Sequence, residues 1–286
     1  MKNQKTIQTL FIAFAILAFS AVCFAQTQQL IKRTAYKTDS VEFGAGGTIS
    51  VTGAPLGSIS IEGWNKNEIE VSAEIEMQAA SEADLAQLAT VNSFVIDQDF
   101  NTTRIVSVGT FDKDYMKRTA KKFPKHLLGL PFKIDYKIKV PRFSDLNING
   151  GSGDFTLSGV DGEVFVKYVN SNARINLIGG SLQATFGAGT VDVLIPTRAW
   201  RGRFADIQLA TGTMNVQLPL SFNAEIDATV LRTGQIENSF GELKPKMRNI
   251  KFTDKSISAK AGIGGVPLKF TVGDGTLKIS ELKKAN

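Results

Sequence analysis

The chain has 286 residues, a formal net charge of +6, one cysteine and one histidine. A mildly basic charge allows contact with anionic polymers, but it is not by itself typical of a nucleic-acid-binding protein. One cysteine excludes an internal disulfide, and one histidine leaves no His/Cys cluster for a zinc site.

The first 25 residues predict a cleaved secretion signal. Lys2 and Lys5 provide a basic start, an apolar run extends from Leu10 to Val22, and small residues precede a cut after Ala25. The run is shorter than the roughly 20 residues that a membrane-spanning helix needs, so we interpret it as a signal and not as an anchor. Cleavage leaves 261 residues without cysteine. We therefore expect an exported protein in the periplasm, at the cell surface or outside the cell.

Two segments follow the signal. Residues 26–40 are polar and lack a regular period, which predicts a linker. Across residues 41–145, apolar and polar residues alternate in short runs between glycine-rich turns, and this pattern predicts an N-terminal β region whose strands each bury one face. One short helix is expected at residues 81–91, because Ser81 can cap its start and three apolar residues fall on one side.

Within this region, residues 110–131 interrupt the strand pattern and predict a basic loop. Its clustered charges are typical of an electrostatic contact with an anionic glycan, a lipid head group or a protein. The alternative is a loop whose charges serve only solubility. Phe123 and three nearby leucines add the apolar surface expected of an interfacial segment. The candidate contact residues are Lys117, Arg118, Lys121, Lys122 and Lys125.

Residues 146–280 carry a repeated phrase that reads glycine, small or polar, apolar, polar, apolar. Copies begin at Gly153, Ala173, Gly189, Gly212 and Gly234. A unit of about 20 residues with two short strands cannot bury its own apolar face, so successive units must stack. Stacking predicts an interior apolar column formed by Phe155, Ile175, Val191, Met214 and Ile236. Residues 281–286 predict a polar tail.

The repeat predicts an all-β protein built as a β-solenoid, in which the short strands of successive units lie on one another. The alternative is an antiparallel β-sandwich, which also has turns at regular intervals. The near-regular spacing of the copies favours the solenoid.

Four stretches near the start of the repeat resemble the bacterial putative adhesin family: Phe132–Pro141, Asp145–Asn149, Gly151–Phe155 and Gly159–Val164. The resemblance extends over roughly residues 41–280. It implies a secreted, glycine-rich stack similar to a right-handed β-helix, with adhesion at the cell surface. It brings no catalytic residue to this chain.

No group of residues predicts catalysis or metal binding. A nucleophilic triad needs a base, and the only histidine, His126, lies in the basic loop. Calcium binding or glycosidase chemistry would need acidic side chains such as Asp145, Asp154, Asp161 and Glu163. Aspartate in turns usually bonds its own backbone instead. We interpret the basic residues of the repeat as a solvated face; they are Lys167, Arg174, Arg198, Arg201 and Arg203. We expect no cofactor and no metal.

These features together predict an exported, non-enzymatic β-repeat protein of the cell envelope, acting in adhesion or in binding to a surface, glycan or protein. The alternative is a periplasmic structural or regulatory module that binds a protein partner, and a polysaccharide-active enzyme is a third reading. The expected partner is an envelope glycan, an anionic lipid or a protein, and not a nucleic acid. The mature chain is expected to have no transmembrane segment.

Overall fold

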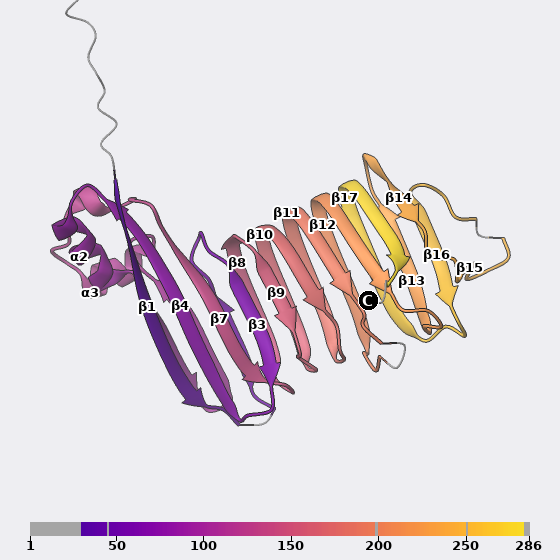
Figure 1. Cartoon of the computed structure of the whole chain (residues 1–286), viewed down its shortest axis with the longest axis horizontal. Helices are drawn as coiled ribbons and strands as arrows, with labels where there is room; N and C mark the ends of the chain where they lie inside the picture. The colour runs from indigo at the N-terminus through magenta and orange to yellow at the C-terminus, as the bar shows by residue number, and fades with distance from the viewer. Residues whose placement is uncertain (1–29, 45, 198–199, 250, 283–286) are drawn as a thin grey trace, which may run out of the picture.

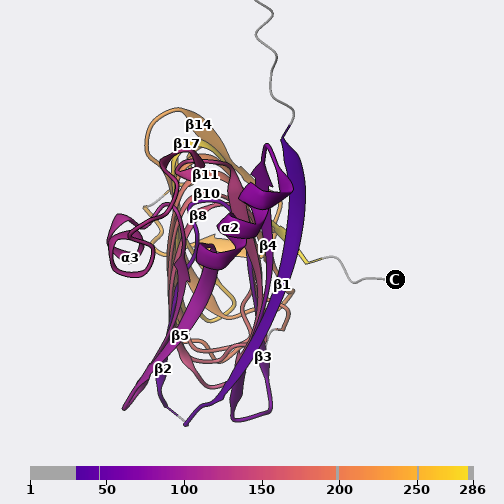
Figure 2. The same ribbon diagram turned by 90° about the vertical axis from the view of Figure 1, so that its left-hand side faces the viewer.

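The computed structural model describes residues 30–44, 46–197, 200–249 and 251–282. This part of the chain is all-β, as the sequence predicts, and its strands form one large mixed sheet. The sheet bends so that two layers face each other across a continuous apolar core (Figure 1, Figure 2). The predicted signal, residues 1–25, lies outside the described residues.

The two layers share their central strands. In spatial order, the first layer consists of β5 (Ser93–Asp99), β6 (Thr102–Val108), β2 (Thr48–Thr52), β8 (Asp145–Ser152), β10 (Glu163–Asn176), β11 (Ser181–Leu194), β12 (Phe204–Leu218), β17 (Val266–Glu281), β13 (Ala224–Val230), β16 (Ser256–Ala261) and β15 (Leu243–Pro245). The second consists of β1 (Ile31–Glu42), β4 (Glu68–Ala79), β7 (Phe132–Pro141), β3 (Ile59–Trp64), β9 (Phe155–Ser158), the same β10, β11, β12 and β17, and β14 (Gly234–Asn238). The four shared strands each cross from one layer to the other.

Neighbouring strands at the centre of the second layer pair in parallel and in register. The strand pairing joins Phe155 to Ala173, Ala173 to Val191, and Val191 to Met214. These side chains are buried, and the apolar column continues through Leu277 of β17 to Ile236 of β14. Parallel pairing in register therefore builds the interior column that the repeat predicts, with one exception.

The exception is the copy in β10, which begins two residues earlier than the Ala173 that the sequence pattern predicts. Ile175 lies opposite Leu157 and Val193, in the second interior column, and Ala173 takes the place predicted for Ile175. Ser171 pairs with Gly189 and therefore occupies the glycine position of the phrase. The residue pattern permits both alignments, since apolar and polar residues alternate equally well in each.

A glycine ladder marks the point where the chain enters the second layer. Its members are Gly57, Gly153, Gly189, Gly212, Gly275 and Gly234, and each has a positive φ. A Cβ atom on Gly212, where φ is 138°, would lie 1.9 Å from the carbonyl oxygen of Gly189 in the adjacent strand β11. Both the backbone conformation and the close approach of the two strands therefore require glycine there.

The order of strands along the stack differs from their order in the sequence near both ends. The C-terminal strand β17 lies between β12 and the β13–β14 segment that precedes it in the chain. Likewise, β2 and β3 lie between β6–β7 on one side and β8–β9 on the other. Each inserted strand pairs on both sides, so segments that are distant in the sequence hold the two ends of the sheet together.

Helices cover the N-terminal end of the core. They are α2 (Glu82–Val91), α3 (Lys113–Thr119) and the 3-10 turn η1 (Lys125–Leu127). Helix α2 confirms the predicted helix, because Ser81 caps it and its apolar side is buried. Helix α3 corrects the predicted basic loop. Asp112 caps α3 by accepting hydrogen bonds from the backbone N–H groups of Asp114 and Tyr115. Leu85 and Leu88 of α2 and Leu127 of η1 are buried in the apolar core, so these elements close its N-terminal end.

The predicted linker at 26–40 is wrong for most of its length, because Ile31–Glu42 is strand β1. This strand pairs antiparallel with β4 along all 12 of its residues. As an edge strand it is polar and partly exposed on both sides, so its sequence lacks clear alternation. Residues 26–29 lie outside the described part. So do 283–286 of the predicted tail, while Glu281 ends β17.

Candidate binding groove

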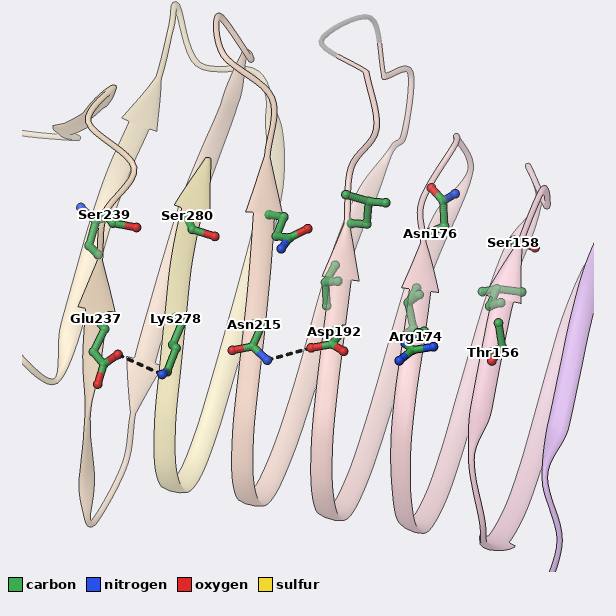
Figure 3. Close-up of a pocket in the computed structure, with 16 residues that line it drawn as sticks. Thr156, Ser158, Arg174, Asn176, Asp192, Asn215, Glu237, Ser239, Lys278 and Ser280 are labelled. Carbon is green, nitrogen blue, oxygen red and sulfur yellow. Dashed lines mark hydrogen bonds and ion pairs between the residues drawn. The ribbon is translucent and has the colours of Figure 1, made fainter. Parts of the chain in front are cut away.

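A groove of about 770 Å³ lies on the outer face of the second layer. It crosses β9, β10, β11, β12, β17 and β14, and Figure 3 shows its lining side chains projecting from these neighbouring strands. The inward side chains of the same strands fill the core. The outward side chains are therefore free to meet a ligand.

Strand register places these outward side chains in two rows across the six strands. The first row is Thr156, Arg174, Asp192, Asn215, Lys278 and Glu237. The second row is Ser158, Asn176, Leu194, Gln217, Ser280 and Ser239. The residues of the first row occupy the fourth position of the repeated phrase. For Arg174 this holds because the copy in β10 begins at Ser171. Thr156, Asn176, Asp192 and Asn215 are the polar fourth residues of the copies that begin at positions 153, 173, 189 and 212 in the sequence, and all four line the groove.

Hydrogen bonds between neighbouring strands tie part of the first row together. Asn215 donates from Nδ2 to Oδ1 of Asp192 at 2.7 Å, and Lys278 Nζ lies 3.3 Å from Oε2 of Glu237 (Figure 3). Arg174 is exposed and has no ion pair within the described residues. The groove thus combines paired charges with one cation that is available to a ligand.

Glu237 remains ionised at neutral pH. Gln235 donates a hydrogen bond to it, Lys278 donates another, and together they lower the pKa of its carboxyl group. A general acid in sugar cleavage requires the opposite, a raised pKa. The side chains of the groove can therefore donate and accept hydrogen bonds, while its exposed carboxylate is unsuited to deliver a proton.

The five basic residues predicted as an anionic contact lie together on the N-terminal cap and are all exposed. Lys117 Nζ lies 3.7 Å from Asp114, and Arg118 Nε donates to the backbone carbonyl of the same residue. Lys121 and Lys122 border a hollow of about 640 Å³ beside the last turn of α2, and neither pairs with a carboxylate in the described chain. This basic cap, formed by Lys117, Arg118, Lys121, Lys122 and Lys125, remains a prediction as a contact site.

The apolar residues of the same segment do not form an interfacial surface. Of the four residues expected to form it, Leu127 is buried, Phe123 and Leu130 pack against the core, and only Leu128 is largely exposed. These side chains face inward because they close the end of the stack. His126 is on the surface, with Nε2 3.2 Å from Asp84 of α2, where it braces the cap.

The other residues weighed in the sequence do not assemble into a reactive site. Asp145 accepts a hydrogen bond from the backbone N–H of Glu163 at 2.7 Å, and Asp154 accepts one from Asn172. Among the described residues, no group of three His, Cys, Asp or Glu side chains could hold a metal ion. Of the five basic residues interpreted as a solvated face, four lie in the described part of the chain, and of these Arg174 alone lines the groove; Arg198 lies outside the described part.

No helix in the described ranges is long and apolar enough to cross a membrane. No protein-family model and no curated protein matches the chain.

Several solved structures are similar to it at low sequence identity. A putative cell adhesion protein from Clostridium sporogenes ATCC 15579 is 11% identical, with a TM-score of 0.49 over 87% of this chain and 100% of the other. A putative adhesin from Bacteroides fragilis NCTC 9343 is 11% identical, with a TM-score of 0.37 over 87% and 97%. A putative lipid binding protein from Parabacteroides distasonis ATCC 8503 is 12% identical, with a TM-score of 0.27 over 87% and 97%. Similarity at this level does not establish a family or a shared function.

Proposed function

We propose that this protein is an exported, non-enzymatic binding protein of the cell envelope, which holds an extended glycan in the groove of the second layer. The observation that carries the proposal is the continuity of two polar rows over six neighbouring strands. Adjacent strands are about 4.8 Å apart, so the rows extend about 24 Å along the stack. A site of this length fits a chain molecule better than a small metabolite.

The chemistry of the rows favours a glycan over a peptide. Most of the side chains are amides and hydroxyls, which both donate and accept hydrogen bonds and so match the hydroxyl groups of sugars. The charges of the first row balance, with Arg174 and Lys278 against Asp192 and Glu237. Leu194 is the one apolar side chain in the two rows, which leaves few pockets for peptide side chains. Arg174 is free to pair with an acidic sugar.

The same groove supports binding without cleavage. Its two carboxylates are engaged by neighbouring side chains, Asp192 by Asn215 and Glu237 by Lys278. A glycosidase needs one protonated and one ionised carboxyl group on either side of the bond that it breaks. We infer that a bound glycan is retained intact, as adhesion requires.

We also infer that the stack is a β-solenoid and not a sandwich. The central strands pair in parallel, coil on coil, whereas an antiparallel sandwich pairs hairpin partners. The antiparallel strands β1, β4, β5, β15 and β16 lie toward the two ends, where they extend the layers (Figure 1).

The proposal is tested by binding of the purified protein to immobilised polysaccharides, using isolated peptidoglycan, a neutral glucan and a polyuronate as probes. Replacing Arg174 and Asn215 together by alanine should weaken binding about tenfold or more, since each lost polar contact is worth about 1 kcal/mol. Gln208→Ala is the matched control. Gln208 is also an amide on β12 bonded to an aspartate, but it lies on the first layer.

Three outcomes would contradict the proposal. The first is that the protein binds none of the three probes, and the second is that Gln208→Ala weakens binding as much as the double variant does. The third concerns cleavage. A fall in the chain length of the bound polysaccharide on incubation would show an enzyme instead.

A further inference from the structure

Strand β1 forms an unusually long free edge. It pairs with β4 from Ile31 opposite Ala79 to Glu42 opposite Glu68, and no described strand pairs with its other side. Figure 1 shows it as the outermost strand of the second layer. Edge strands expose backbone N–H and C=O groups that can pair with another chain, and proteins commonly keep them short. An edge of 12 residues is therefore a candidate interaction surface.

The basic side chains of β1 bind groups of their own chain and so do not guard this edge; on the outer side, Lys32 Nζ lies 2.6 Å from Oε2 of Glu76. Arg33 and Lys37 point to the inner side, where they bind groups of their own chain. Arg33 forms an ion pair with Glu82 of α2, and Lys37 Nζ donates to the carbonyl oxygen of Phe94 at 2.7 Å. On the outer side, Tyr36 is 77% exposed in the middle of the strand. This leaves an aromatic side chain available for packing at the centre of a free edge, whose backbone groups can pair with another strand.

The order of charges along β1 makes the strand complementary to itself. Its first half, residues 31–36, carries Lys32 and Arg33, and its second half, residues 37–42, carries Lys37, Asp39 and Glu42, so the formal charges of the halves are +2 and −1. An antiparallel copy would therefore bring the basic half against the acidic half. Directly opposite residues of an antiparallel pair lie on the same face of the sheet. The sheet is therefore extended only by registers in which inward-facing residues of one copy lie opposite inward-facing residues of the other.

One such register is favoured. With Tyr36 opposite Tyr36, Arg33 faces Asp39, Thr34 faces Thr38 and Ile31 faces Val41. These are an opposite-charge pair, a hydroxyl pair and an apolar pair, each of which stabilises adjacent strands. The two neighbouring registers that keep the same faces are shifted by two residues. A shift in one direction places Lys37 opposite Lys37 of the other copy, and a shift in the other direction places Arg33 opposite Lys37. Like charges directly opposite each other destabilise a strand pair.

We propose that two copies of this chain associate through β1, antiparallel, about a twofold axis at Tyr36. The contact is isologous, since the same strand serves both copies. It joins the second layers into one continuous sheet whose outer faces lie on the same side at the junction. Both grooves then open on that side, which would give a dimer two sites for one polymer. The pairing itself does not depend on what the grooves bind.

Cysteine cross-linking tests the register, in a Cys23→Ser background that removes the only native cysteine. Tyr36→Cys should form a disulfide-linked dimer under mild oxidation, because directly opposite residues have Cβ atoms about 5 Å apart, near disulfide range. Thr34→Cys alone should not form this disulfide. In the proposed register, position 34 of one copy lies opposite position 38 of the other, so the two cysteines at position 34 would be about 13 Å apart along the strand. A mixture of Thr34→Cys and Thr38→Cys chains should cross-link.

A charge exchange tests the contact in solution by sedimentation velocity. Asp39→Arg should shift the dimer toward monomer at least tenfold in Kd, and adding Arg33→Asp in the same chain should recover the dimer. A purely structural effect of either change would not be reversed by the other. The proposal is overturned if the unaltered protein is monomeric at every concentration reached, if Thr34→Cys cross-links as well as Tyr36→Cys, or if the double exchange fails to recover the dimer while its circular dichroism is unchanged.

Discussion

The glycine ladder gives a prediction that separates two physical constraints. Gly212 combines a φ of 138° with a Cβ position 1.9 Å from a backbone oxygen. Gly129 has a φ of 85° but open space around its Cβ position. Gly187 is the reverse, since its φ is not positive and its Cβ position lies 2.3 Å from the carbonyl oxygen of Val169. Gly241 has neither constraint. Alanine at these four positions tests conformation and coil spacing independently.

The expected costs follow from the structure. Holding alanine in a left-handed conformation costs about 1 to 2 kcal/mol, which applies to Gly129→Ala. In Gly187→Ala, relieving the backbone clash requires the two adjacent strands to separate. The separation weakens about two interstrand hydrogen bonds, which cost about 1 kcal/mol each. Gly212→Ala incurs both the conformational cost and the cost of the clash, so it should lower the free energy of unfolding by about 4 kcal/mol. Gly241→Ala should change the free energy of unfolding by less than about 0.5 kcal/mol.

Urea unfolding measures these free energies, with Trp64 and Trp200 as fluorescent reporters. Trp200 is buried beside Phe222, so its emission should change when the stack opens. The reasoning is refuted if Gly212→Ala costs no more than Gly129→Ala, because coil spacing would then add nothing to the conformational cost. A loss of stability in Gly241→Ala as large as in Gly187→Ala would equally contradict it.

Two further predictions concern charges. Arg232 and Thr233 donate hydrogen bonds to Asp274, which holds the pKa of its carboxyl group well below its usual range. A depressed pKa stabilises the fold at pH values above about 4 and loses this effect as the pH falls further. Asp274→Asn should therefore lower Tm at pH 7, with the difference from the unaltered protein shrinking toward pH 2; a constant difference would contradict the assignment. Binding of the basic cap to vesicles containing anionic lipid should fall when all five of its residues become glutamine, and should weaken at about 1 M salt, where the Debye length is about 3 Å. Unchanged flotation of the variant with these vesicles would exclude the contact.

The sequence alone predicts the features that depend on neighbouring residues. Alternation of apolar and polar residues indicates strands with one buried face, and Ser81 marks the start of a helix that the structure confirms. The fourth position of the repeated phrase indicates the outward row that includes Asp192 and Asn215. An N-cap at Asp112 would also have indicated α3, although the clustered lysines obscured it.

Features that depend on pairing between strands needed the tertiary structure. The side chains of a strand repeat every two residues, so moving the β10 copy from Ser171 to Ala173 leaves every side chain on the same face. Only the hydrogen bonds to β9 and β11 fix the alignment. For the same reason β1 could not be recognised, since an edge strand with two polar sides has no alternation to reveal it.

The groove shows both contributions. Its polar positions are local, but the pairing of Lys278 with Glu237 exists because β17 inserts beside β14, 41 residues away in the chain. The local pattern of either strand does not indicate which strand lies beside it, because nearly every residue offers the same backbone hydrogen-bonding groups whatever its side chain. The sequence thus determined which faces are polar, and the order of the coils decided which polar groups meet.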